Sequence, residues 1–347
     1  ALIIHTSESA GYPWKVVQSS WSHERFSLVD APEPPLRIKG WMTEEAARRL
    51  VSLAGKDLDA LRKSAESRKF RPVPLAVALS DTIVNTMRRL ETANVLGLLR
   101  GSDPEKRREV VVYTAHHDHF GIGTPIKGDS IYNGALDNAS GTSLLLAVAT
   151  GFAEGTPKPK RSVLFAAVAA EEQGLLGSEY YVAHPTFPLN KIVANINVDG
   201  ANLLGMVRDI QMIGKGRSSL DATIESVAKE MGLGVVPDQS PELGFFYRSD
   251  QFNFAKAGIP SAYFHPGVDI KGKPAGWGKA QREKFIAEDY HQPSDEIKAS
   301  WDFGGAVQQA HFTFLVGYRV ANADGIPQWN PGDEFEAARK KSVEGKP

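Results

Sequence analysis

The sequence contains no cysteine, and this single absence removes several kinds of chemistry at once. Disulfide bonds, thiolate metal sites and cysteine nucleophiles all need a side chain that the chain lacks. Any metal ion must therefore be held by histidine and carboxylate groups, a ligand set suited to zinc, manganese or cobalt. The compartment stays open, because cytosolic and exported proteins can both lack cysteine.

Long apolar runs and a strong net charge are missing as well. The apolar stretches, such as residues 162–170, are too short to span a bilayer, so we expect no membrane span. The formal net charge is -1, which favours neither a nucleic acid nor a membrane surface as a partner. A Gly-x-Ser-x-Gly motif is also absent, which argues against a serine nucleophile.

What remains is an ordinary globular composition in a chain long enough for two domains. Hydrophobic residues make up 42% of the 347 positions and charged residues 23%. We expect residues 1–86 to form a small accessory unit, in which Thr43 caps a helix, and residues 87–347 to form the main domain. The chain opens abruptly with Ala1-Leu2-Ile3-Ile4 and shows no signal peptide, so we expect the natural protein to begin further upstream.

The main domain alternates between apolar runs that resemble strands and segments that resemble helices. The runs are residues 110–115, 162–169, 192–198 and 260–264, and the helical segments are 142–152, 174–183, 219–231 and 250–257. This alternation is typical of a sheet covered on both faces. The sequence therefore predicts the α/β class, with a mixed, mostly parallel central sheet and helices on both faces. We expect the polar tail after Gly325 to run over the surface.

Residue types that bind metals follow three of these runs. His116 and Asp118 end the first run, Glu171 and Glu172 follow the second, and Asp199 follows the third. Ligands of open α/β sheets bind outside the carboxyl ends of the strands, so these side chains should meet at one edge. A single polar residue after a strand usually only begins a loop, but three such strand ends together indicate a site.

Two loop segments carry further candidates. Asp137 lies within residues 133–141, directly before an apolar helix, and His291 lies within the polar residues 289–295. Taken alone, Asp137 is most simply an N-cap or turn aspartate, and a lone loop histidine means little.

Five segments together carry a specific resemblance. They are Ala115-His116-His117-Asp118, Asp137-Asn138-Ala139-Ser140-Gly141, Glu171-Glu172, Asn197-Val198-Asp199 and Tyr290-His291-Gln292-Pro293-Ser294-Asp295. In this order and spacing they resemble the co-catalytic zinc aminopeptidases of metallopeptidase family twenty-eight, over roughly residues 92–321. The resemblance implies the fold of a zinc-dependent exopeptidase.

The resemblance also implies a set of metal ligands. His116 and Asp199 would hold one zinc ion, Glu172 and His291 would hold the other, and Asp137 would bridge the pair. Three carboxylates and a bridging hydroxide balance the four positive charges of two such ions, which lie roughly 3.5–4 Å apart in sites of this kind. Mn²⁺ or Co²⁺ are possible substitutes.

Further roles come with the same resemblance. Asp118 would orient His116 through its second ring nitrogen, Glu171 would be the general base, and Tyr290 would donate a hydrogen bond to the developing oxyanion. His117 and His119 receive no role from it, and we take them as local or rim residues.

The implied function is that of a dizinc exopeptidase acting on peptides with a free N-terminus. A carboxypeptidase or dipeptidase on the same dimetal core stays open; it would need a cation for the substrate carboxylate, and Arg248 and Lys273 are the nearest candidates. A single-zinc acyltransferase similar to glutaminyl cyclase and a receptor-like binding protein without catalysis are further alternatives. The sequence gives no indication of an oligomeric state.

The accessory unit and two loops bear on substrate and location. Residues 1–14 resemble the latter part of a protease-associated domain, which leads us to expect a periplasmic or extracellular protein. The aromatic residues 245–247 either line a side-chain pocket or pack against the sheet, and we expect residues 267–279 to shape the mouth of the site.

Overall fold

The computed structural model describes residues 1–29, 36 and 38–344, and its chain divides into two compact units. One unit comprises Ala1–Gln18 and Asp30–Glu91, and the other comprises Ser19–Val29 and Thr92–Pro347. The sequence placed all of residues 1–86 in an accessory unit. The structure instead groups the short segment Ser19–Val29 with the large unit.

Among its described residues, the small unit contains two parallel strands and several short helices. The elements are β1 (Leu2–His5), α1 (Ser7–Ala10), α2 (Trp14–Trp21, whose last three residues belong to the large unit), β2 (Gly40–Thr43), α3 (Glu44–Leu53) and α4 (Leu58–Ala65). Thr43 caps α3 as predicted, since its side chain accepts a hydrogen bond from the backbone amide of Ala46 at 3.2 Å. Ala47, Val51 and Leu58 form its buried core.

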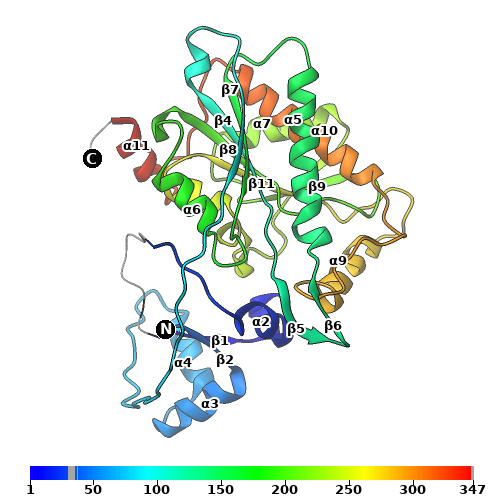
Figure 1. Ribbon diagram of the computed structural model, residues 1–347. Coiled ribbons are helices and arrows are strands. Elements are labelled where there is room, and N and C mark those ends of the chain that lie inside the picture. Colours follow the sequence, from blue (N-terminus) through cyan, green and yellow to red (C-terminus); the bar gives the residue numbers. More distant parts are fainter. Residues whose placement is uncertain (30–35, 37, 345–347) are drawn as a thin grey trace. The chain divides into compact units, whose positions relative to one another are not determined.

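A seven-stranded sheet forms the centre of the large unit (Figure 1). Its strands are β3 (Val95–Leu99), β4 (Val110–His116), β7 (Ser162–Val168), β8 (Ile192–Asn197), β9 (Asp209–Ile213), β10 (Gly234–Pro237) and β11 (Ser261–Pro266), in the order β10-β9-β11-β8-β4-β7-β3. The pairings β11·β9 and β3·β7 are antiparallel, and the others are parallel. A separate hairpin joins β5 (Gly121–Ile126) to β6 (Asp129–Tyr132).

Helices cover both faces of this sheet. They are α5 (Gly141–Glu154), α6 (Leu176–Ala183), α7 (Leu220–Glu230), α8 (Gln251–Lys256), α9 (Trp277–Glu288), α10 (Gly304–Asn322) and α11 (Glu336–Glu344). Val111 and Tyr113 of β4 join the core beneath α5, α7 and α10, whereas Val110 and Val112 join the core beneath α6 and α8. In Figure 1, α5 and α10 lie on one side of the sheet and α6 on the other. The predicted fold class is confirmed.

We expected the C-terminal tail after Gly325 to run over the surface, and that prediction was wrong, because part of the tail is buried. Trp329 is buried and its ring nitrogen donates a hydrogen bond to the carbonyl of Gly258 at 2.9 Å. Phe335 is also buried and stacks on Phe246, so the middle one of the three aromatics at 245–247 packs into the core. Burial of the two aromatic side chains docks this otherwise polar segment on the protein, because each ring removes a large apolar area from water.

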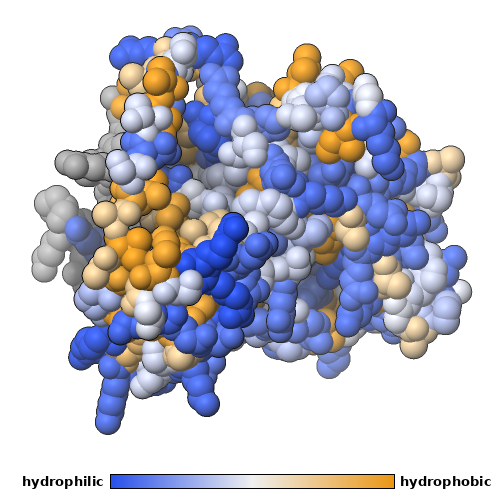
Figure 2. Space-filling model, turned by 90° about the horizontal axis from the view of Figure 1, so that it is seen from below, coloured by the Kyte–Doolittle hydropathy of each residue, from blue (hydrophilic) through white to orange (hydrophobic). Residues whose placement is uncertain are grey.

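No helix among the described residues is long and apolar enough to cross a bilayer. On the face shown in Figure 2, hydrophilic residues cover most of the surface and hydrophobic residues gather in separate patches.

Candidate metal centre

Adjacent parallel strands bring the predicted ligands to one edge of the sheet. β4 pairs in parallel with β7 on one side and with β8 on the other. His116 is the last residue of β4, Glu172 follows β7, and Asp199 follows β8. Their side chains therefore start from neighbouring strand ends and need only short loops to meet.

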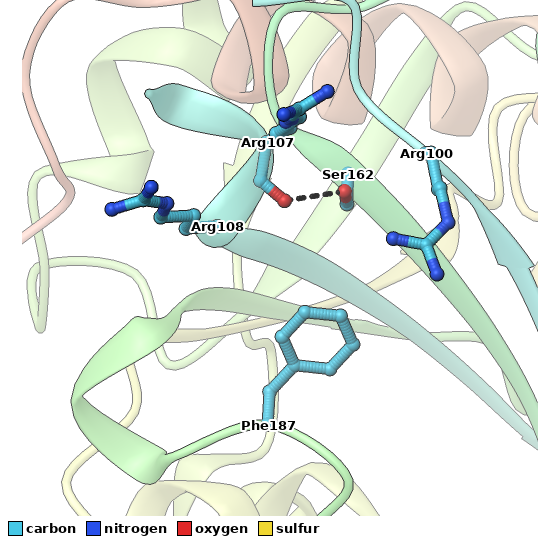
Figure 3. A pocket seen from close by; sticks show the side chains of 5 residues that line it. All are labelled: Arg100, Arg107, Arg108, Ser162 and Phe187. Carbon is cyan, nitrogen blue, oxygen red and sulfur yellow. Dashed lines mark hydrogen bonds between the residues drawn. The ribbon is translucent and has the colours of Figure 1, made fainter. Parts of the chain in front are cut away.

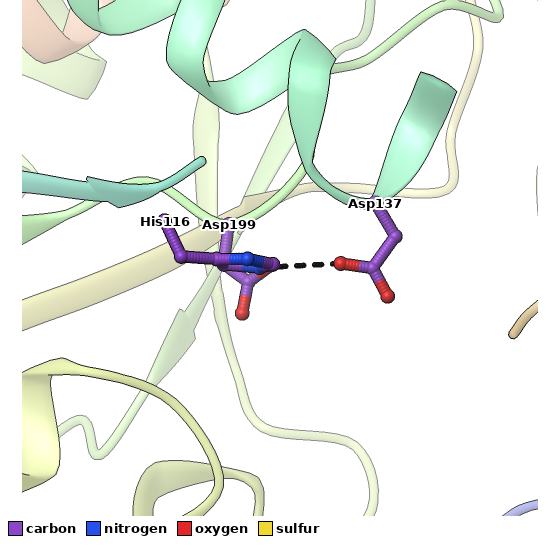
Figure 4. Close-up of side chains that lie close together, drawn as sticks. All are labelled: His116, Asp137 and Asp199. Atoms are coloured by element: carbon purple, nitrogen blue, oxygen red, sulfur yellow. Dashed lines mark hydrogen bonds and ion pairs between the residues drawn. The ribbon is translucent and has the colours of Figure 1, made fainter. Parts of the chain in front are cut away.

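His116 lies at the centre of the first group. Its Nε2 atom is 3.2 Å from Oδ1 of Asp137 and 3.3 Å from Oδ1 of Asp199 (Figure 4). The ligand atoms of these three residues lie close enough together to hold one metal ion. His116 is 1% exposed, so the imidazole is fixed by packing as well as by its polar partners.

His291 occupies the corresponding place in the second group. Its Nε2 atom is 3.2 Å from Oδ2 of Asp137 and 3.3 Å from Oε2 of Glu172. Asp137 thus presents one carboxylate oxygen to each histidine, which is the arrangement expected of a ligand that bridges two metals. The five predicted ligands converge on a single site.

The side chains of Asp295 and Asn138 hold the loop that carries Asp137 through hydrogen bonds to backbone amides. The carboxylate of Asp295 accepts from the backbone amide of Asp137 at 3.0 Å and from the preceding amide at 2.9 Å. Asn138 Oδ1 accepts from the amides of Gly141 and Gly200, at 3.0 and 2.7 Å. A Cβ atom on residue 141 would come within 2.0 Å of that same oxygen, which explains the glycine of the Asp-Asn-x-x-Gly segment.

Asp118 joins the ends of β4 and β7. Its carboxylate accepts hydrogen bonds from the backbone amides of Glu171 and Glu172, at 3.0 and 3.2 Å. Nδ1 of His116 is 3.7 Å from its Oδ1 and 3.2 Å from its backbone carbonyl oxygen. Asp118 is therefore placed to fix both the imidazole of His116 and the turn that presents the two glutamates.

Two residues of the site adopt backbone conformations that non-glycine residues rarely use. The φ angles of Ala170 and His291 are both 55°. Such strain persists where the surrounding structure enforces it, and it is common at functional sites. Ala170 directly precedes Glu171 and Glu172, so the turn that positions these two side chains has a strained backbone.

The carboxylates of the site differ in how readily they ionise. Burial raises the pKa of Glu171 well above its ordinary value, and the charges of Asp199 and Glu172 raise it further. Burial raises the pKa of Glu172 to about 8, against the opposing charge of His291. Asp137 behaves differently: burial acts against ionisation, but hydrogen bonds from the two histidines hold its pKa well below the ordinary range.

This donor set fits divalent metal ions. Buried carboxylates that burial keeps from ionising would be stabilised in their charged form by a bound dication. Carboxylate oxygens and imidazole nitrogens are the ligands that zinc accepts in a protein without cysteine.

His119 is a residue that the sequence interpretation missed. Its Nδ1 atom lies 2.7 Å from Oε1 of Glu172, and His119, Asp137 and Glu172 form a second group that could hold a metal ion. His117, by contrast, is exposed, and its Nε2 atom lies 3.2 Å from the carbonyl oxygen of Ala93.

Tyr290 lies against the ring of His291. The two ring centroids are 3.8 Å apart and the planes are inclined by 29°. Burial raises the pKa of the Tyr290 phenol well above 10, and the negative charges of Asp137 and Glu172 raise it further. The phenol is therefore neutral and able to donate a hydrogen bond.

The two cations considered as carboxylate receptors lie over aromatic rings. The Lys273 ammonium is 4.8 Å from the ring centroid of Trp277, and the Arg248 guanidinium is 5.6 Å from that of Phe245. The loop that contains Lys273 ends where α9 begins at Trp277.

A separate cavity of about 420 Å³ lies at the opposite end of β4 and β7 (Figure 3). Arg100, Arg107, Arg108, Ser162 and Phe187 line it, and Ser162 donates a hydrogen bond to the carbonyl of Arg107 at 2.7 Å. It contains none of the candidate metal ligands.

Comparison with known proteins supports the resemblance seen in the sequence. The model of the family described as Peptidase family M28 matches residues 94–315. Aminopeptidase NAALADL1 of Mus musculus is 30% identical over 57% of this chain and 26% of its own length. Leupeptin-inactivating enzyme 1 of Streptomyces exfoliatus is 31% identical over 63% of this chain and 49% of its own length. Aminopeptidase YwaD of Bacillus subtilis is 30% identical over 59% and 40%.

The chain spans between about a quarter and a half of the length of these curated relatives. Among solved structures, a crystal structure of a zinc aminopeptidase from Bacillus subtilis is 24% identical, with a TM-score of 0.49, over 67% of this chain and 51% of that one.

Proposed function

The chain belongs to peptidase family M28, and from that premise we propose that it is a dizinc aminopeptidase that hydrolyses N-terminal residues from peptides. The observation that carries the proposal is the position of Asp137. Each of its two carboxylate oxygens lies 3.2 Å from the Nε2 atom of a different histidine, His116 or His291. A carboxylate with one oxygen in each half of a site is the natural bridge between two cations.

His116 and Asp199 would hold one zinc ion, and Glu172 and His291 would hold the other. The carboxylates of Asp137, Glu172 and Asp199 bring three negative charges against the four positive charges of two such ions. Bound zinc supplies a water of lowered pKa and a Lewis acid for the scissile carbonyl. One further negative charge would bring the loaded site close to neutral.

Glu171 is the proposed base. It contributes no ligand atom to either candidate metal group, and burial already raises its pKa well above the ordinary value. In this role it takes a proton from the attacking water and returns it to the leaving amine. Tyr290, whose phenol stays neutral, donates a hydrogen bond to the carbonyl oxygen as negative charge develops there.

The preference for the amino end follows from charge. Glu171 and Asp199 place negative charge beside the nucleophile, which suits the ammonium group of a free N-terminus. A carboxypeptidase needs a cation for the terminal carboxylate. Lys273 and Arg248, the two candidates, lie over the aromatic rings of Trp277 and Phe245. Two of the relatives are named aminopeptidases, which agrees with this direction.

Three versions of one short peptide test the proposal: unmodified, acetylated at the amino end, and amidated at the carboxyl end. We expect acetylation to abolish cleavage and amidation to be tolerated. Cleavage of the acetylated peptide together with loss on amidation would make the protein a carboxypeptidase. Turnover of none of the three with zinc present would favour the receptor-like alternative.

Metal analysis tests the dizinc part separately. We expect two zinc ions per chain and loss of activity on treatment with a chelator. One ion per chain at full peptidase activity would reject the dizinc site, whereas one ion per chain without peptide cleavage would favour the single-zinc acyltransferase instead.

A further inference from the structure

The short segment Ser19–Val29 lies in the same compact unit as the metal centre, although it is far in the sequence from every candidate metal ligand. Ser20, within this segment, is 4% exposed. Its hydroxyl oxygen is 2.6 Å from Nδ1 of His291. This is the ring nitrogen opposite the one that faces Asp137 and Glu172.

The chemistry of a metal ligand fixes the direction of this hydrogen bond. If Nε2 of His291 binds a metal it carries no proton, so the proton of the neutral imidazole sits on Nδ1. Nδ1 then donates to the hydroxyl of Ser20. A partner of this kind selects the tautomer and holds the plane of the ring.

Arg25 connects the same segment to the loop that follows Glu172. Its Nη1 donates to the carbonyl of Ser20 at 3.0 Å and its Nη2 donates to the carbonyl of Gln173 at 3.2 Å. The guanidinium also lies 4.0 Å from the ring centroid of Trp21. The Arg25 side chain thus links the backbone of Ser20 to the backbone of Gln173, the residue directly after Glu172.

Both of these bonds go to backbone carbonyls. The Arg25 bonds therefore leave the oxygens of Glu172 to other partners, while the guanidinium still fixes the loop that carries them. A lysine could not replace this bridge, because its single ammonium lacks the planar fork that reaches two acceptors at once.

We infer that Ser20 and Arg25 are positioning residues for the metal ion proposed to lie between Glu172 and His291: Ser20 orients the imidazole, and Arg25 holds Ser20 and the Glu172 loop in register. The inference rests on the proposed dizinc function. The two halves of the centre are then unlike, because Nδ1 of His116 meets the backbone carbonyl of Asp118 at 3.2 Å whereas Nδ1 of His291 meets the hydroxyl of Ser20 at 2.6 Å.

The test is a pair of nearly isosteric variants, Ser20→Thr and Ser20→Val, which differ only in the hydroxyl. Zinc binding to the metal-free chain is measured by titration calorimetry. We expect Ser20→Val to weaken one of the two sites about 10–100-fold and Ser20→Thr to retain wild-type binding. Ser22→Ala, an exposed position of the same segment, is the control and should bind both ions normally. Arg25→Met should weaken the same single site, and Arg25→Lys should not restore it.

The thermal midpoint of the metal-free variants separates positioning from folding. Both metal-free variants should still unfold cooperatively, and we expect the difference in unfolding temperature between Ser20→Val and Ser20→Thr to widen once zinc is added. Equal zinc affinity in this pair, or equal weakening of both sites in Ser20→Val, would overturn the inference. Fewer than two zinc ions bound by the wild-type chain would instead reject the dizinc function, so the two failures are distinguishable.

Discussion

The imidazole of His119 and the carboxyl group of Glu172 are within hydrogen-bond distance of each other in the metal centre, with Nδ1 2.7 Å from Oε1. Burial lowers the pKa of His119 and so favours its neutral ring. When Glu172 is ionised, as a metal ligand must be, Nδ1 of His119 donates a hydrogen bond to its carboxylate. Its other nitrogen, Nε2, is buried and has no hydrogen-bond partner among the residues that the structure describes. His119 is therefore a partner of the candidate ligand Glu172 and not a rim residue.

Replacing His119 by alanine should weaken the metal site that contains Glu172. The hydrogen bond orients the carboxylate, and loss of such a partner lowers metal affinity about 10–100-fold. Zinc titration of the metal-free variant measures the effect, and His117→Ala, at an exposed position, is the control. If His119 is itself a ligand in place of His291, one zinc ion will be lost altogether. Identical binding by the two variants would show that His119 has no part in the centre.

The adjacent glutamates should respond differently to the same substitution. Glu171→Gln keeps the size of the side chain and removes its basicity, so we expect turnover to fall roughly 100-fold or more while two zinc ions stay bound. Glu172→Gln should instead lower the affinity of one metal site. Turnover and metal content are measured on the same samples. Loss of a metal ion from Glu171→Gln would reverse the two assignments.

Much of the fold could be predicted because its signals are local. The apolar runs ending at His116 and the helix that begins near Gly141 stand out in the sequence, and the structure has β4 and α5 there. Parallel strands bring their carboxyl ends together, so residues that follow neighbouring strands meet without any further information. That is why candidate ligands far apart in the sequence could be grouped in advance.

What the sequence could not show are contacts made only by the tertiary fold. Ser20 lies 271 positions from His291, and nothing in the residues around Ser20 indicates a metal centre. The helix α9 begins at Trp277, within residues 267–279 that we took as a loop, and its polar surface gives little periodic signal. The buried Trp329 and Phe335 were hidden in the same way by the polar residues between them.

Asp137→Ala should damage metal binding more than any other single change in the centre. It removes one oxygen from each half and leaves two dications without a carboxylate between them. We expect loss of both zinc ions at concentrations that saturate the wild-type chain. Asp199→Ala serves for comparison, because Asp199 belongs to the His116 half of the centre, and it should lose one ion. Equal losses in the two variants would argue against a bridging role.

The last prediction concerns Asp250, a buried carboxyl near the centre. The residue is 0% exposed, and neither of its carboxylate oxygens has a hydrogen-bond partner within the described part of the chain. The nearby Ser178 hydroxyl favours ionisation, but it donates to the carbonyl of Leu175 at 3.1 Å. Burial raises the pKa of Asp250 to about 7, against the opposing charge of His116.

This shift makes the stability of the metal-free protein depend on pH. The folded chain keeps a proton on Asp250 up to about pH 7, whereas the unfolded chain releases it at about pH 4. Folding is therefore favoured at low pH, and this contribution is lost as the pH rises from about 4 to about 7. Asp250→Asn cannot ionise, so it should raise the thermal midpoint relative to wild type at pH 8 and much less at pH 5. A gain of about 3 °C or more at pH 8 is expected for roughly 1 kcal/mol.

Two comparisons complete the experiment. Asp81→Asn, at an exposed position, should leave the pH dependence unchanged. Zinc should reduce the difference between Asp250→Asn and wild type, because nearby cations favour the ionised carboxylate and lower the pKa of Asp250. A gain in thermal midpoint that is the same at pH 5 and pH 8 would mean that packing, and not the proton on Asp250, is responsible.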